Sequence, residues 1–377
     1  METKITDNNT EILLEEKKNN RLLSLDFFRG LTMFLLIAEF SHLFIYLTAP
    51  ELNGTFIYSI GKQFHHMSWE GMHFWDLIQP FFMFIVGVAM PLSFANRMKK
   101  GATYNELLKH AVKRSLLLLF LGWALYCIDP GKIVFRFQNV LAQLSVTYML
   151  AFLVMRKKPA VQIAFSVLLI LISEAAYRFF PVEGFNHAFV NGENFGSWLN
   201  IQISGAENNS SWAIFNAIPT TAHTIWGVLA GQLLMSKKTD KRKIQILVIA
   251  GVIGLVIGFG LSGITPIIKR IATSTFVFAS GGWTFLALAL CYWIIDIKKY
   301  QKGVWIFAVV GLNPLFIYLF AHVGGADLIQ KIVLPFSNAL FGWAGELITP
   351  IILSMIVLFF LWYITYWMFK KKIFIRI

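Results

Sequence analysis

The chain has 377 residues, of which 57% are hydrophobic and 14% charged, with a formal net charge of +13 and a mean hydropathy of +0.63. A soluble globular domain carries about 25% charged residues, so this composition excludes that class. The lysines and arginines lie in short clusters between apolar runs, a pattern that sets orientation in a bilayer and argues against nucleic-acid binding.

Apolar runs of membrane-spanning length recur along the whole chain and predict an all-α, polytopic membrane helix bundle. Residues 1–21 are polar and mixed in charge, and we expect them to form a flexible cytoplasmic tail before a single transmembrane domain over residues 22–377. We predict ten transmembrane helices, over residues 24–48, 75–95, 112–128, 139–155, 160–179, 212–235, 243–262, 273–296, 303–323 and 347–369.

The distribution of basic residues predicts the orientation. The expected N-terminal tail, the C-terminal stretch KKKIFIRI and four alternate connections together hold 25 of the 33 lysines and arginines, whereas the other five connections hold 7. By the positive-inside rule, both termini are expected in the cytoplasm. The loop FHHMSWEG (64–71) is then expected on the far side, which is the periplasm if the chain lies in a bacterial inner membrane.

The first predicted span carries three charges. Asp26 and Arg29 share a helix face at its cytoplasmic end, as an interfacial ion pair or as a site where Arg29 meets an anionic ligand. Glu39 lies about 22 Å into the helix, where a carboxylate must be paired or protonated and is a functional candidate by default. His42, three residues on, is its expected partner, and a purely structural Glu–His pair is the alternative.

The second predicted span begins within FHHMSWEGMHFWDLIQPFF (64–82), a stretch dense in titratable side chains. Asp76 could cap the helix, but capping does not explain the polar cluster before it. A zinc site is one alternative, because the possible ligands His65, His66, Glu70, His73 and Asp76 gather here. Their spacing does not match a helical HExxH arrangement, so no metal is predicted.

Two further spans are interrupted by polar residues and prolines. Asn216 lies near Pro219 in the sixth predicted span, and Asn313 precedes Pro314 in the ninth. Such breaks are tolerated where they line a cavity. They can equally hold neighbouring helices together, so both interpretations stay open.

The order of these motifs resembles the heparan-α-glucosaminide N-acetyltransferase family of transmembrane acyltransferases, including its bacterial members. The pair LDxxRG and HxSWxG…D…P carries most of the resemblance. The matching segments are RLLSLDFFRGLTM (21–33), HMSWEGMHFWDLIQPFFMFIVG (66–87), RFQNVLAQLSVTYML (136–150), FNAIPTTAHTIWGVLAG (215–231), residues 268–296 and VVGLNPLFIY (309–318).

The resemblance implies an acetyltransferase that moves an acetyl group from cytosolic acetyl-CoA to the amine of glucosamine across the membrane. His66 matches the family's active-site histidine, and Glu39 falls where the family often has asparagine. About 21 polar residues precede the first span, in place of the large lumenal domain of the animal enzymes, which favours a short amino sugar as acceptor. The family also suggests a homodimer.

Site roles follow from this resemblance together with the polar positions. We expect catalysis from His66, Glu39 and Asp76. Acetyl-CoA is the expected co-substrate, with contacts from Arg29, Asp26, Asn216 and Asn313. The expected contacts of the amino sugar are Trp69, Glu70 and His42.

Two other functions remain open from the sequence. A proton-coupled sugar transporter would also place carboxylates and histidines in a membrane bundle, although no convincing internal repeat of the kind common in transporters is visible. An O-acetyltransferase acting on a sugar of the cell envelope is the nearer enzymatic alternative.

Overall fold

The computed structural model describes residues 22–205 and 211–375, and the predicted tail lies outside these residues. The described chain is helical and divides into two compact units. The terminal unit consists of His73–Ile78 and the described parts of Met1–His66 and Leu290–Ile377. The central unit consists of Met67–Met72 and Gln79–Ala289.

Six helical segments of the described chain are long and apolar enough to cross a membrane, which indicates a polytopic integral membrane protein. The total of ten spans and the orientation of the chain in the membrane remain predictions. The six segments are Phe74–Lys99, Tyr104–Ile128, Pro159–Arg178, Asp240–Gly260, Ser274–Ile297 and Pro314–Lys370.

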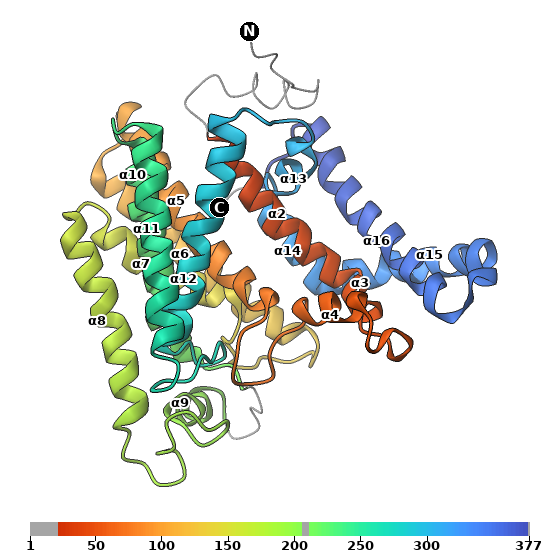
Figure 1. Cartoon of the computed structure of the whole chain (residues 1–377), viewed down its shortest axis with the longest axis horizontal. Coiled ribbons are helices and arrows are strands. Elements are labelled where there is room, and N and C mark those ends of the chain that lie inside the picture. The colour runs from red at the N-terminus through yellow and green to blue at the C-terminus, as the bar shows by residue number, and fades with distance from the viewer. Residues whose placement is uncertain (1–21, 206–210, 376–377) are drawn as a thin grey trace. The chain divides into compact units, whose positions relative to one another are not determined.

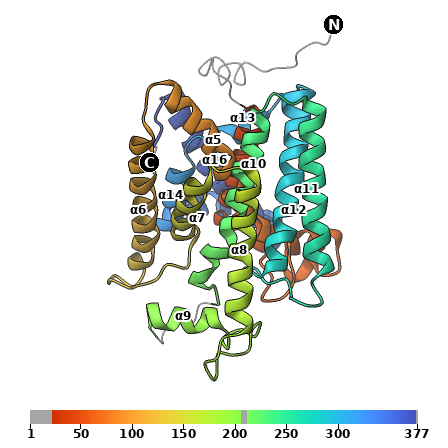
Figure 2. The same ribbon diagram turned by 90° about the vertical axis from the view of Figure 1, so that its left-hand side faces the viewer.

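The central unit is a helix bundle, coloured from orange to teal in Figure 1 and turned by 90° in Figure 2. Local signals fix several helix starts: the hydroxyls of Thr103 and Thr239 and the side-chain oxygen of Asn139 each accept a backbone N–H of the first turn. Its helices are α5 (Ile78–Lys99), α6 (Tyr104–Ile128), α7 (Val140–Val154), α8 (Pro159–Arg178), α9 (Phe195–Ser204), α10 (Ala217–Met235), α11 (Asp240–Gly260) and α12 (Ser274–Cys291).

The helices of the terminal unit come from both ends of the chain. The long helix α2 (Leu23–Phe40) packs against α13 (Val304–Val310), and a methyl group at Gly30 would lie 2.0 Å from the carbonyl oxygen of Phe307. The glycine of the LDxxRG motif therefore permits contact between the two backbones. The other α-helices are α3 (Leu43–Tyr46), α4 (Phe56–Gln63), α14 (Pro314–Phe320), α15 (Ala326–Phe341) and α16 (Gly345–Lys370). The unit also contains the 3₁₀ turns η1 (Pro50–Leu52), η2 (Phe74–Leu77) and η6 (Gly342–Ala344) and the π-helices η4 (Tyr292–Ile297) and η5 (Ala321–Gly325).

Two elements differ from the sequence prediction. The first span, predicted over residues 24–48, ends at Phe40 because His42 adopts a left-handed conformation with φ of 63° before α3 begins. Residues 324–346, predicted as a connection, contain α15. The predicted interruption at Asn313 and Pro314 is confirmed, since α13 ends before it and α14 begins at the proline.

Candidate active site

The centre of the candidate site is a hydrogen bond between His66 and Asp76. His66 lies in the loop after α4, and Asp76 lies in η2 at the start of the second predicted span. The Nδ1 atom of His66 is 2.8 Å from Oδ1 of Asp76. Both residues belong to the terminal unit, and the loop between them folds back so that residues ten positions apart meet.

The Asp76 carboxylate has a second task. Its Oδ2 atom accepts the backbone N–H of His73 at 2.9 Å, which caps the first turn of η2. The residue is completely buried. The capping role that the sequence indicates for Asp76 and the contact with His66 are therefore carried out by the two oxygens of one carboxylate.

This geometry fixes the chemistry available to the His66 ring. In a neutral imidazole one nitrogen donates and the other accepts. When Nδ1–H donates to Asp76, the accepting nitrogen is Nε2. The side chain of His66 is 38% exposed and that of Asp76 is 1% exposed. The pair thus presents a positioned imidazole backed by a buried carboxylate, the arrangement that supports general-base or nucleophilic chemistry.

Glu39 reaches this region through Trp75. Its Oε1 atom accepts the indole N–H of Trp75 at 2.9 Å, and Trp75 is 1% exposed. Trp75 immediately precedes Asp76 and packs against Phe44, with ring centroids 5.1 Å apart. Glu39 on α2 therefore holds Trp75, the residue that precedes Asp76 in the chain.

His42 does not occupy the position expected for a partner on the same helix face as Glu39. It lies beyond the end of α2, and its Nε2 atom is 3.5 Å from Oδ1 of Asp327 on α15. The left-handed backbone at His42 turns the chain out of the helix, so the three-residue spacing to Glu39 no longer defines a common face.

The two histidines beside His66 serve the loop itself. Nε2 of His65 lies 3.1 Å from the hydroxyl of Thr48 and 3.2 Å from the carbonyl oxygen of Phe44. Nδ1 of His73 lies 2.9 Å from the carbonyl oxygen of His65. These contacts tie the loop to α3 and to itself, and so support the geometry in which His66 meets Asp76.

The middle of the motif belongs to the central unit. Trp69 donates its indole N–H to the carbonyl oxygen of Phe189 at 2.7 Å. Glu70 forms an isolated antiparallel bridge with Ile268, and the N–H of Gly71 donates to Ile267 at 2.8 Å. Gly71 has φ of 112°, a backbone conformation that side-chain-bearing residues rarely adopt, which explains the motif's glycine.

The expected acetyl-CoA contacts lie in both units. Asp26 is buried and Arg29 is half-buried on α2 of the terminal unit. Asn313, also in the terminal unit, donates to the carbonyl oxygen of Ile373 and accepts the N–H of Ile375, both at 2.9 Å, which favours its structural interpretation. Asn216, in the central unit, donates to the carbonyl oxygen of Arg270 at 2.7 Å.

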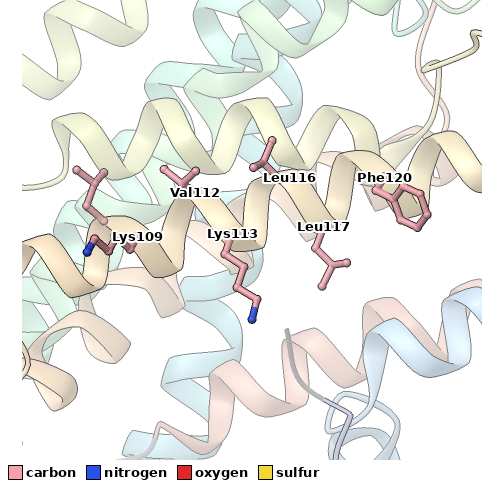
Figure 3. Close-up of a pocket in the computed structure, with 7 residues that line it drawn as sticks. Lys109, Val112, Lys113, Leu116, Leu117 and Phe120 are labelled. Atoms are coloured by element: carbon pink, nitrogen blue, oxygen red, sulfur yellow. The ribbon is translucent and has the colours of Figure 1, made fainter.

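A pocket of about 640 Å³ lies along α6, and Figure 3 shows Lys109, Lys113 and the apolar side chains that follow one another on that helix. None of its seven lining residues is a predicted site residue. Within residues 22–205 and 211–375, no three His, Cys, Asp or Glu side chains gather closely enough to hold a metal ion.

Trp75 is the site residue that sequence reasoning missed. It lies 36 positions from Glu39, so no helical spacing connects the two. Its signal in the sequence is its place next to Asp76 at the start of an apolar run, together with an indole N–H that needs an acceptor when buried.

Comparison with known proteins identifies the family. The family described as "Heparan-alpha-glucosaminide N-acetyltransferase, catalytic" matches residues 21–261, which include Glu39, His66 and Asp76. A relative named heparan-alpha-glucosaminide N-acetyltransferase from Mus musculus is 34% identical over 139 residues, covering 34% of this chain and 18% of the relative.

A relative of the same name from Homo sapiens is 25% identical over 368 residues, covering 79% of this chain and 52% of the relative. The chain thus spans about half or less of the length of these curated relatives. The family match extends over more than half of the chain and contains the His66–Asp76 pair. The chain therefore belongs to the heparan-alpha-glucosaminide N-acetyltransferase catalytic-domain family.

Proposed function

We propose that this protein transfers an acetyl group from acetyl-CoA to the amine of glucosamine or a short amino sugar. The observation that carries the proposal is the 2.8 Å contact between His66 and the buried Asp76, in a chain of this family. The acceptor class comes from the name that both relatives carry. We further propose that acetyl-CoA enters from the cytoplasm and that the acceptor lies on the periplasmic side of a bacterial inner membrane.

In the proposed reaction, the neutral amine attacks the thioester carbonyl, a C–N bond forms and the C–S bond breaks. The proton lost by the amine passes to Nε2 of His66, while CoA leaves as the thiolate and is then protonated. Asp76 keeps the ring in the required tautomer and stabilises the imidazolium. A positioned base of this kind contributes about 10²–10⁴ in rate.

A variant of this reaction uses His66 as a carrier. Nε2 then attacks the thioester first, CoA leaves, and the amine takes the acetyl group from the imidazole in a second step. Isolation of an acetylated protein after incubation with acetyl-CoA alone supports this route. Absence of such a species in rapid-quench samples, with full turnover once acceptor is added, supports direct transfer.

The remaining contacts stay predictions. Arg29 and Asp26, with Asn216 and Asn313, are the proposed contacts of acetyl-CoA. For the amino sugar we propose Trp69, Glu70 and His42. A homodimer is a further prediction that rests on the resemblance.

One assay separates the candidate functions. Purified protein is incubated with acetyl-CoA and glucosamine, and free CoA and N-acetylglucosamine are measured by mass spectrometry. We expect both products from the wild type and from His187→Ala, a control in which the exposed side chain of another histidine is removed. We expect neither above background from His66→Ala.

Other outcomes would overturn the proposal. Acetylation on a hydroxyl would establish the O-acetyltransferase. Passage of labelled glucosamine into proteoliposomes without CoA release would establish the transporter. Full activity of His66→Ala would remove the histidine from the mechanism.

A further inference from the structure

The central unit contains a second pocket, which is mostly apolar, unlike the polar candidate site. It has a volume of about 670 Å³ and lies among α8, α10, α11 and α12. Figures 1 and 2 show α11 and α12 side by side in this unit. Nearly all of its lining is apolar, and at its rim Ile163 on α8 is 49% exposed and Ile253 on α11 is 53% exposed.

Close helix packing shapes the floor of this pocket. A methyl group at Gly254 on α11 would lie 2.9 Å from the Cα of Gly282 on α12, so these backbones touch. The floor is aromatic: the rings of Trp226 and Phe278 lie 5.5 Å apart. The indole N–H of Trp226 donates to the hydroxyl of Ser166 at 3.0 Å. The floor therefore suits a hydrocarbon better than a sugar or a pantetheine amide, which need hydrogen-bond partners.

Polar and charged residues lie at one end of this pocket. Ser236 and Lys238 line the pocket where α10 ends and the connection to α11 begins. That connection and the first turn of α11, residues 237–243, carry five basic residues and one acidic residue. Lys238 is exposed, and its backbone N–H bonds the hydroxyl of Ser236 at 3.4 Å.

We propose that this groove binds one acyl chain of an anionic phospholipid, with the lipid phosphate at Lys238. The lining on α11 runs from Ile246 to Gly254, a length of about 12 Å along the helix. Half of a bilayer's hydrocarbon core is about 15 Å thick, so the groove matches a chain from one leaflet. Clustered lysines and arginines at a membrane surface attract anionic lipids, which selects the headgroup.

The test uses the full chain, purified and examined by native mass spectrometry with added dioleoyl phosphatidylglycerol or dioleoyl phosphatidylcholine. We expect one phosphatidylglycerol to bind about tenfold more tightly than phosphatidylcholine. Lys238→Glu is expected to remove most of that preference. Lys237→Glu, which changes a neighbouring lysine outside the lining, is the matched control and should keep most of it.

A second pair of variants tests the groove itself. Ala250→Phe fills the groove from α11 and is expected to weaken binding of phosphatidylglycerol about tenfold or more. Ile249→Phe changes an exposed neighbour that does not line the groove and should bind as the wild type does. If Ala250→Phe fails to fold, Leu229→Trp fills the groove from α10 instead.

Three results would overturn the proposal. Equal binding of both lipids, unchanged by Lys238→Glu, would exclude the phosphate contact. Unchanged lipid binding in the filled variants would place the lipid elsewhere. A change from dimer to monomer in the filled variants, without loss of lipid, would show that a second copy of the chain occupies the groove. Acetyl transfer is not a readout, so failure of the proposed function does not affect the test.

Discussion

The stretch FHHMSWEGMHFWD (64–76) divides into two parts that are held in different ways. The outer part, which contains His66 and Asp76 and belongs to the terminal unit, is organised by side-chain hydrogen bonds around a buried carboxylate. The inner part, Met67–Met72 of the central unit, is held through backbone pairing at Glu70 and Gly71 and one indole contact. One motif therefore combines the proposed catalytic pair with an anchoring part, and substitutions should separate the two.

The largest expected effect comes from Asp76→Asn. The amide oxygen is needed by the N–H of His73, so the NH₂ group faces Nδ1 of His66 and favours the tautomer with a protonated Nε2. We expect the acetyl-transfer kcat to fall about 10²–10⁴-fold. Steady-state kinetics measures it, with thermal unfolding as the folding control. A variant that keeps its stability and its kcat would exclude Asp76 from the reaction.

Glu39→Leu should have the next largest effect. It leaves the buried indole N–H of Trp75 without this acceptor, at a cost of about 1–3 kcal/mol. We expect about a tenfold loss in kcat, since Trp75 is chain-adjacent to Asp76. Glu39→Gln keeps an accepting oxygen and is the matched control. Equal losses in both variants would show that the charge of Glu39, rather than its hydrogen bond, matters.

Trp69→Phe tests the anchoring part. It removes the hydrogen bond to Phe189 while keeping an aromatic ring, and should cost about 1 kcal/mol of stability. We expect kcat at saturating amino sugar to change less than threefold, because the His66–Asp76 pair does not include this residue, whereas the proposed sugar contact of Trp69 predicts a higher KM. Denaturant unfolding and steady-state kinetics on one preparation measure both. A loss of kcat as large as that of Asp76→Asn would contradict the division of the motif into a catalytic part and an anchoring part.

The smallest effect is expected for His42→Gln. Its contact with Asp327 joins two partly exposed side chains, and such pairs contribute about 0–1 kcal/mol. We therefore expect a change in unfolding free energy below about 0.5 kcal/mol. Thermal unfolding of the variant and of Asp327→Asn measures it. A larger loss in both would show that this contact fixes the join between α2 and α15.

Much of the helical architecture is visible in the sequence because hydropathy alone marks a long apolar helix. The interruption before Pro314 was equally visible, since proline lacks the N–H that a continuous helix needs. The end of α2 could not be predicted, because nothing in the composition of residues 39–48 indicates a left-handed backbone at His42. Helix α15 was not predicted because the charges of Asp327 and Lys331 lower the hydropathy of this segment and Pro335 interrupts its helical pattern.

The candidate site divides in the same way. The family resemblance singled out His66 within a compact motif that also contains Asp76, and only nine residues separate the two. The partner of Glu39 was predicted incorrectly from local spacing, because the indole that it accepts comes from another segment of the chain. Local periodicity describes neighbours on one helix and is silent about such tertiary pairs.

Because one carboxylate of Asp76 both caps η2 and contacts His66, the position of the first turn of η2 and the orientation of the His66 ring are coupled. A rotation of the first turn of η2 that lengthened the hydrogen bond to His73 would also move the oxygen that faces His66. Any ligand or lipid that shifts the start of this helix would then change the hydrogen bond of the imidazole without contacting the ring. Control of the reaction would in that case be exerted on the helix rather than on the histidine.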